Sequence, residues 1–318
     1  MRAAVITAFG QPPRYQHHSD PVPGSGTVLV EVLAAGLHPR VRSGAAGTHY
    51  TSTRTLPLVP GFDGVGRTED GRRVFFGGLT PPNGSMAEQV AVPVEHLVEL
   101  PDDIDDVTVA AAMNPGMSAW LALTHRAFLR PGESVLVLGA TGNAGQMAVQ
   151  LARLLGAGTI TAAGRNPDAL AELPALGADD TVSLDADDDT IDARLAETAG
   201  NVDVVVDYLW GHVTETAMTA IAGARKDAAH RLRWIHVGAM AGPAITLPGA
   251  ALRKVNIDLV GSGQGSVSPT DMNTAYRELA DRLPTANLTI ETLAMPLSEV
   301  EAVWNTTTPS GTRIVLVP

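Results

Sequence analysis

Apolar and polar positions follow two different patterns along the chain. Up to about residue 106, short alternating runs are separated by turns rich in proline and glycine, a pattern typical of an irregular, mostly antiparallel β domain. From about Val107, alanine-rich helical stretches alternate with compact apolar strands. The strand cores are expected at 135–138, 159–163, 203–206 and 234–237, and the helices between them from near 144, 167, 187 and 213. This alternation predicts an α/β fold with a doubly wound parallel sheet.

The two patterns predict two domains. A chain of 318 residues is long for one core and typical of two. We expect residues 114–261 to form the parallel-sheet domain. The tail from residue 262 is too short to bury a core alone, so residues 1–113 and 262–318 are expected to form the β-rich substrate domain together.

A glycine-rich loop joins a buried strand to a helix with one apolar face, in the sequence SVLVLGATGNAGQMAVQLARLLGA from Ser134 to Ala157. Gly139 suits a tight turn, Gly142 the approach of a pyrophosphate, and Gly145 close packing of the helix on the strand. The spacing is GxxGxxG rather than GxGxxG, and a turn without a ligand is the alternative. Because a helix N-terminus favours phosphates, the loop predicts a Rossmann dinucleotide site formed by Gly139, Ala140, Thr141, Gly142, Asn143, Ala144 and Gly145.

The end of the next strand indicates which dinucleotide is bound. NAD sites usually have an acidic residue there, which accepts hydrogen bonds from the ribose hydroxyls. Here the strand ends with Gly164, Arg165 and Asn166, without a carboxylate. A hydrogen bond from arginine to a phosphate contributes roughly 1.5 to 3 kcal/mol. Arg165 therefore favours NADPH, and a solvated arginine at a strand end is the alternative.

Composition excludes several classes of protein. The chain has 22 Lys and Arg against 34 Asp and Glu, and the net charge of −12 disfavours nucleic acids and anionic membranes as partners. Without cysteine there is no disulfide, thiol nucleophile, iron–sulfur cluster or cysteine-based zinc site. No run approaches the ~20 apolar residues of a membrane span, and the first residues do not resemble a signal peptide. We expect a cytoplasmic protein.

Seven segments in order carry a wider pattern: VLVEVLAAGLHP, LPLVPGFDGVG, GSMAEQVAVP, MNPGMSAWLAL, RPGESVLVLGATGNAGQMAVQLARLLGA, NVDVVVDYLWG and LVGSG. Together they resemble the medium-chain dehydrogenase/reductase superfamily, in its zinc-free quinone oxidoreductase and enoyl reductase branch. The resemblance implies a GroES-like substrate domain and hydride transfer, in the cleft between the domains, to a quinone or an activated double bond. It also implies a homodimer.

The positions that hold a catalytic zinc in other members of this superfamily differ here. Those members have a cysteine after the LAAG-like strand and a histidine in a GHE motif, where this chain has His38 and Phe62, followed by Asp63. The segment between residues 66 and 91 contains no cysteine lobe for a structural zinc. We therefore expect no metal. Zinc-free members usually have Asn-Pro where this chain has His38-Pro39, which implies a remodelled pocket floor.

The resemblance also suggests catalytic residues. The stretch AGTHYTSTRTLPLVPGFDG resembles the enoyl thioester reductase segment whose tyrosine is the usual proton donor, and Tyr50 is the matching residue. A phenol there can protonate the enolate left by hydride delivery; a packed loop aromatic is the alternative. His38 and His49 are candidates to orient a carbonyl, or polar lining of the pocket. Arg42 is a candidate to bind an anionic group, or a solvated arginine.

Further cofactor contacts are expected at strand ends, because ligands of doubly wound sheets lie outside the carboxyl ends of the strands. Asp207 closes one strand. The resemblance implies nicotinamide contacts at the ends of the next two strands and an Asn-Pro pair before the cofactor domain. The residues are Asn114, Asp207, Val237, Gly238, Ala239, Gly261 and Ser262. For Gly238, a plain strand-end turn is the alternative.

The sequence thus predicts an NADPH-dependent, zinc-independent oxidoreductase of quinones or α,β-unsaturated compounds, with Tyr50, His38 and Arg42 as the catalytic candidates. An enoyl thioester reductase is the alternative among enzymes. A non-catalytic NADPH-binding sensor or structural protein is the alternative from another class.

Overall fold

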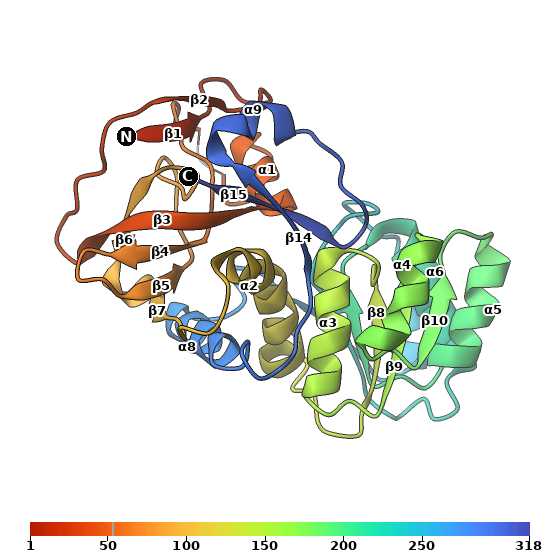
Figure 1. Ribbon diagram of the computed structural model, residues 1–318. Coiled ribbons are helices and arrows are strands. Elements are labelled where there is room, and N and C mark those ends of the chain that lie inside the picture. The colour runs from red at the N-terminus through yellow and green to blue at the C-terminus, as the bar shows by residue number, and fades with distance from the viewer. Residues whose placement is uncertain (53) are drawn as a thin grey trace. The chain divides into compact units, whose positions relative to one another are not determined.

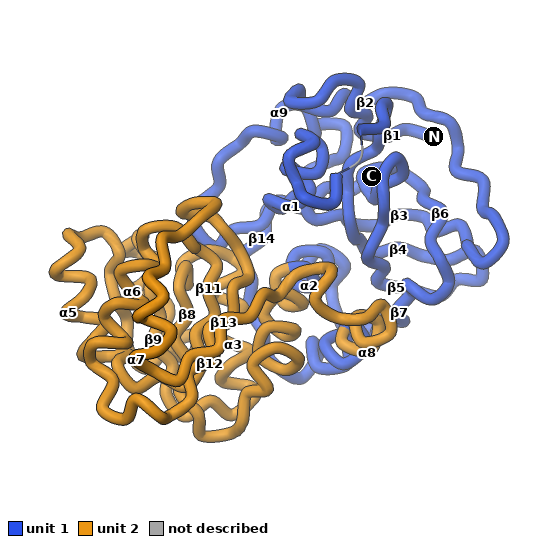
Figure 2. The backbone as a smooth tube through the Cα atoms, turned by 180° about the vertical axis from the view of Figure 1, so that it is seen from behind, with its two compact units in different colours: residues 1–114, 276–318 blue, residues 115–275 orange. Residues whose placement is uncertain are grey.

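The computed structural model describes residues 1–52 and 54–318 and divides the chain into two compact units (Figures 1 and 2). Unit 1 consists of Met1–Asn114 and Tyr276–Pro318, and unit 2 of Pro115–Ala275. The first boundary falls inside α2 (Asp106–Leu121) and the second inside α8 (Pro269–Ala280). The division at 113/114 and 261/262 stays a prediction.

Unit 2 is built on a parallel sheet, and all its residues are described. The strand order is β10-β9-β8-β11-β12-β13, with every neighbouring pair parallel. The predicted parallel Rossmann sheet is confirmed. The strands are β8 (Ser134–Leu138), β9 (Thr159–Gly164), β10 (Asp180–Ser183), β11 (Val204–Asp207), β12 (Leu232–His236) and β13 (Ile257–Gly261).

The helices of unit 2 begin where the sequence provides capping residues. The side chain of Asn166 accepts a hydrogen bond from Ala169 N, and that of Asp187 accepts one from Thr190 N, which satisfies N–H groups that have no partner within the helix. Helix α3 packs on β8 and β9, and α5 packs against α6. The helices are α3 (Asn143–Leu154), α4 (Pro167–Glu172), α5 (Asp188–Ala199), α6 (Gly211–Ala224) and α7 (Ala251–Lys254), with a π-helical turn at Ala122–Arg126 and a 3-10 helix at Leu173–Leu176.

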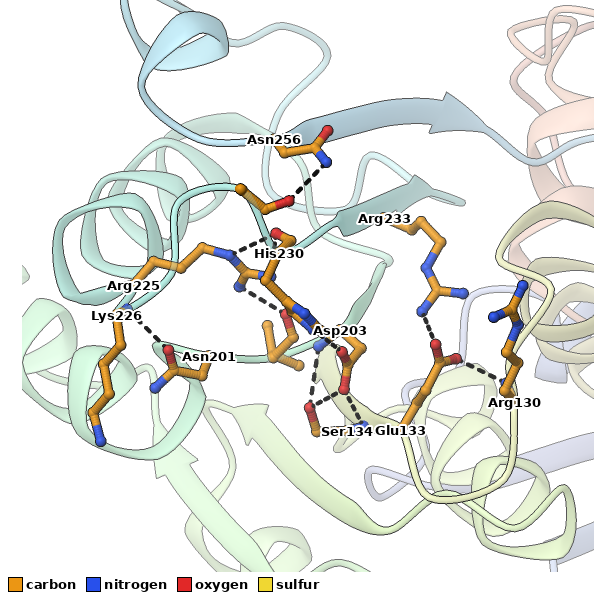
Figure 3. A network of polar contacts seen from close by, with 12 residues as sticks. Arg130, Glu133, Ser134, Asn201, Asp203, Arg225, Lys226, His230, Arg233 and Asn256 are labelled. Atoms are coloured by element: carbon orange, nitrogen blue, oxygen red, sulfur yellow. Dashed lines mark hydrogen bonds and ion pairs between the residues drawn. The ribbon is translucent and has the colours of Figure 1, made fainter.

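A polar network ties together the amino ends of the strands in unit 2, at the edge opposite the expected ligand (Figure 3). Asp203, just before β11, accepts hydrogen bonds from Ser134 N and Oγ at 2.7 Å each and one from His230 Nε2. Burial raises the pKa of Asp203, but these hydrogen bonds outweigh it and hold the pKa below its ordinary value. Serine and histidine both bind the carboxylate rather than each other, so the network is structural and not a catalytic triad.

Unit 1 is an antiparallel-rich β structure. In its described part, the larger sheet has the order β14-β15-β3-β4-β5-β7, with β6 also paired to β3, and only β14 and β15 pair in parallel. The strands are β1 (Arg2–Val5) and β2 (Arg14–His17), which pair with each other, and β3 (Thr27–Leu37), β4 (Gly64–Thr68), β5 (Arg73–Phe76), β6 (Gln89–Pro93), β7 (Leu97–Glu99), β14 (Glu291–Pro296) and β15 (Thr312–Val317).

The C-terminal segment completes the core of unit 1. Ile314 and Leu316 of β15 are buried with Val30 and Val32 of β3. Helices α1 (Pro39–Ala45) and α9 (Val300–Val303) and 3-10 helices at Val94–His96 and Leu297–Glu299 complete the unit. Among the described residues of the whole chain, no helix has the length and apolar character needed to span a bilayer.

Candidate active site

The glycine loop of unit 2 is shaped by the absence of side chains. Gly139 has a φ of +89°, which favours glycine, and the N–H groups of Gly139 and Ala140 both donate to the Ala163 carbonyl, at 2.9 and 2.8 Å. A Cβ on Gly145 would lie 2.2 Å from the Gly139 carbonyl oxygen. The first turn of α3 therefore lies directly against the loop, and any side chain at Gly145 would force them apart.

The N-terminus of α3 suits an anion. Its N-cap is Gly142, which is exposed and offers no side-chain cap, while Ala140, Thr141 and Gly145 are buried. A Cβ at Gly142 would meet only the Gly139 carbonyl oxygen, at 3.9 Å. A ligand can thus approach the backbone here closely, and the helix dipole favours a phosphate at this place. Asn143 and Ala144 open the helix beside it.

The end of β9 lies against this loop. A Cβ on Gly164 would lie 2.4 Å from Thr141 Cγ2, so the Thr141 side chain packs directly against the Gly164 backbone. Asn166 uses its Oδ1 to accept a hydrogen bond from Ala169 N at 3.0 Å, which makes it the cap of α4. Arg165 between them is exposed. Of the three predicted residues, Arg165 is the one that offers a phosphate a positive charge.

Asp207 at the end of β11 accepts hydrogen bonds from several neighbouring segments of unit 2. Its side chain is fully buried, and its carbonyl oxygen accepts hydrogen bonds from Val237 N and Gly238 N. Its carboxylate accepts four hydrogen bonds of 2.7 to 3.0 Å, from the N–H groups of Leu209 and Trp210, the Thr214 hydroxyl and the Trp234 indole. We therefore assign Asp207 a positioning role, in which it fixes the strand ends that a cofactor would contact.

The ends of β12 and β13 lie side by side. Ser262 N donates to the His236 carbonyl at 2.8 Å, and Gly261 O accepts a hydrogen bond from Arg126 Nε at 2.9 Å. A Cβ on Gly238 would lie 2.9 Å from the Tyr208 carbonyl oxygen, so close packing requires glycine here. Val237 and Ala239 flank it. Asn114 is the last residue of unit 1, within α2.

In unit 1, His38 and Asp63 form a buried pair. His38 Nε2 lies 3.0 Å from Asp63 Oδ1, and the two residues are each 1% exposed. Burial lowers the pKa of His38 more than the Asp63 carboxylate raises it, so the ring is neutral at pH 7. A neutral ring that donates from Nε2 has only a lone pair on Nδ1. In this state the free Nδ1 atom of His38 would accept rather than donate a hydrogen bond, and a catalytic role for His38 stays a prediction.

Tyr50 lies on an exposed loop after α1. Its side chain is 73% exposed, and its ring contacts the ring of His49 at 4.3 Å between centroids. Burial, aided by the charge of Arg40, lowers the pKa of His49 to about 4. Arg40 Nη2 donates to Thr51 Oγ1 at 3.2 Å and so connects this loop to α1.

Two arginines that sequence analysis did not single out lie beside these candidates. The Arg40 guanidinium stacks on Phe62 at 3.8 Å and interacts electrostatically with Asp63. Arg313, from β15, is 5% exposed and also interacts with Asp63. The motif HPR could have drawn attention to Arg40. Nothing local marks Arg313, because only the pairing of β15 with β3 brings it to the end of β3.

His38 and Phe62 stand at positions that hold zinc ligands in other superfamily members, and their contacts here do not fit a metal centre. His38 and Asp63 are bonded to each other, and Phe62 replaces a ligand. Across residues 1–52 and 54–318, no group of three or more His, Cys, Asp or Glu side chains could hold a metal ion.

Comparison with known proteins shows which families and relatives this chain is similar to. The model of the zinc-binding dehydrogenase family matches residues 144–281. A protein of Emericella nidulans described as a probable NADPH-dependent quinone reductase is 29% identical over the full length of both chains. Human quinone oxidoreductase is 36% identical over 178 residues, about half of each chain (52% of this one and 53% of the other).

Solved structures show the same similarity to quinone oxidoreductases. The quinone oxidoreductase of Thermus thermophilus, also solved in complex with NADPH, is 28% identical, with a TM-score of 0.83 over both whole chains. A mycobacterial quinone oxidoreductase shares the fold, with a TM-score of 0.86 at 21% identity. The parallel sheet and glycine loop of unit 2 form a Rossmann fold, and the relatives named above are oxidoreductases. In sequence and in fold the chain is similar to quinone oxidoreductases, in agreement with its resemblance to the medium-chain dehydrogenase/reductase superfamily.

Proposed function

We propose that this protein is an NADPH-dependent, zinc-independent oxidoreductase that reduces quinones or activated, α,β-unsaturated double bonds. The observation that carries the proposal is the glycine loop, where Gly145 lets α3 begin against the loop and Gly142 leaves the helix N-terminus open to a phosphate. When bound, NADPH supplies the hydride. The Thermus thermophilus relative, solved with NADPH, supports this choice of cofactor.

Preference for NADPH over NADH would come from Arg165. Arg165 is exposed and follows Gly164, which packs against Thr141 of the glycine loop, at the strand end where NAD sites usually carry an acid. A charged hydrogen bond to the 2′-phosphate contributes roughly 1.5 to 3 kcal/mol, equivalent to a factor of about 10 to 150 in affinity.

Zinc is not needed for this chemistry as we propose it. An activated double bond or quinone is itself an electron acceptor, and the chain's task is to hold it about 3 to 3.5 Å from the donor carbon in the correct orientation. The mutual hydrogen bond of His38 and Asp63, where other superfamily members bind zinc, supports a reaction without a metal.

Tyr50 is our candidate for the proton donor in alkene reduction. Its phenol can deliver a proton to the α-carbon of an enone, and its exposure leaves the hydroxyl accessible to a ligand. The same geometry suits an enoyl thioester, which stays the second candidate substrate class. A quinone takes its protons on oxygen and has no need of this group.

We further propose a homodimer formed through β13. This strand lies at the edge of the parallel sheet, and Leu259 on it is 39% exposed. Unpaired edge strands readily pair with a second copy of the same strand. A cytoplasmic location also remains a prediction.

The test is NADPH oxidation by the wild type and the Tyr50→Phe variant with a quinone, a small enone and an enoyl thioester. We expect enone turnover to fall roughly 100-fold in the variant, in line with loss of general acid catalysis, and quinone turnover to be retained. Equal turnover of the enone by both proteins would make Tyr50 a lining residue. Background oxidation with every acceptor, despite NADPH binding, would favour the non-catalytic sensor.

A further inference from the structure

Unit 1 contains three guanidinium groups and one buried carboxylate that are linked by electrostatic interactions. Arg40 and Arg42 lie on α1, Arg313 lies on β15, and the carboxylate is that of Asp63. Arg313 interacts electrostatically with both Asp63 and Arg42, and Arg40 interacts with Asp63. We call these four residues the arginine cluster.

The charges of the arginine cluster do not balance. The neighbouring His38 is neutral, so the arginine cluster holds three positive charges and one negative charge, in a chain whose net charge is −12. Buried charges without counter-charges are costly. Burial accordingly lowers the pKa of all three guanidinium groups, that of Arg313 to about 10. A bound anion would offset this cost.

Two donors of the arginine cluster are also unused. The Nε atoms of Arg42 and Arg313 are buried and have no hydrogen-bond partner among the described residues. Arg42 Nη2 donates to the Thr306 carbonyl, at 3.3 Å. These two groups interact with each other although both are positive. Planar guanidinium groups bind carboxylates through paired hydrogen bonds, so a carboxylate suits both the charge and the donors.

We propose that Arg42 and Arg313 bind a carboxylate of the substrate, which is therefore an unsaturated or quinoid acid rather than a neutral compound. This inference rests on the proposed function, from which it takes the reducible group. Arg40 connects the arginine cluster to the candidate proton donor, because its guanidinium is bonded to Thr51 and interacts with Tyr50. The anion site and Tyr50 thus belong to one network within unit 1.

The experiment compares an acid with its ester. (E)-3-Benzoylacrylic acid and its methyl ester carry the same activated double bond and differ in charge. At saturating NADPH, we expect the wild type to show a kcat/KM roughly 10- to 150-fold higher for the acid, the range of one charged hydrogen bond. In the Arg42→Gln variant the ratio of acid to ester should fall to near one.

Arg67→Gln is the matched control. Arg67 is an exposed arginine of β4, in the same unit, and donates to the Gly71 carbonyl at 3.1 Å. Its variant should retain the wild-type ratio. Arg313→Lys tests the buried partner with its charge retained, and it should also lower the ratio because lysine lacks the planar pair of donors. Circular dichroism verifies that each variant is folded.

A binding measurement distinguishes the proposed anion site from the proposed reductase activity. 3-Benzoylpropionate has the carboxylate but no reducible double bond, and titration calorimetry should detect binding to the wild type that weakens at least 10-fold in Arg42→Gln, the lower end of the range for one charged hydrogen bond. If it binds in this way but neither benzoylacrylate is reduced, the anion site stands and the proposed function fails. If the ester is reduced as well as the acid and 3-benzoylpropionate does not bind, the proposed function stands and the anion site is wrong.

Discussion

At the scale of single residues, burial decides the charge that each group carries. Asp63 is 1% exposed and is the negative partner of Arg40 and Arg313. We predict that Asp63→Asn destabilises the protein by about 3 to 5 kcal/mol, because it leaves buried cations without a counter-charge. Urea unfolding measures this. The exposed Asp180→Asn should change stability by less than about 0.5 kcal/mol, and equal losses in both variants would contradict the pairing.

The lowered pKa of His49 in unit 1 predicts that the stability of the protein depends on pH. The pKa of His49 is lowered to about 4, while the unfolded chain binds the same proton near pH 6.5. The unfolded state therefore holds more protons between these values, and the free energy of unfolding falls as the pH drops from 6.5 toward 4. We expect His49→Gln to lessen this fall by about 1 kcal/mol, after allowance for partial exposure. Urea midpoints at pH 7.5 and 5 measure it, and an unchanged fall would show that His49 is protonated in the folded state.

At the scale of elements, the junction of β8 and α3 requires a glycine at position 145. Gly145→Ala places a methyl group 2.2 Å from a backbone oxygen, so we expect a loss of about 1 to 3 kcal/mol in stability and weaker NADPH binding. Gly223 in α6 is the matched control, because a Cβ there meets nothing within 4 Å. Gly223→Ala should stabilise the helix by up to about 1 kcal/mol. Thermal unfolding with and without NADPH compares the two, and an undisturbed Gly145→Ala protein would contradict the packing.

The same scale shows how far the sequence could predict the structure. The helix starts expected near 144, 167, 187 and 213 lie within two residues of α3, α4, α5 and α6, because caps and apolar spacing are local signals. β10 has only one buried residue, Val182, and no apolar pattern marks it. Arg313 joins the arginine cluster through the pairing of β15 with β3, which spans more than 270 residues of sequence. No local pattern contains that information.

At the scale of the whole molecule, the edge strand β13 predicts assembly. We expect a dimer in sedimentation velocity, and a shift toward monomer in Leu259→Arg, because a charge on the exposed edge opposes strand pairing. Leu293→Arg changes a similarly exposed leucine on β14 and serves as a comparison. A wild-type monomer at micromolar concentration would contradict assembly through β13.

The central claim is that unit 2 holds NADPH for hydride transfer, with Arg165 selecting it over NADH. The most direct test is steady-state oxidation of NADPH and of NADH by the purified protein with a quinone and an enone, in the wild type and in Arg165→Gln. We predict a kcat/KM at least about 10-fold higher for NADPH in the wild type and a preference near one in the variant. Equal use of both cofactors by the wild type, or no oxidation of either above background, would contradict the account.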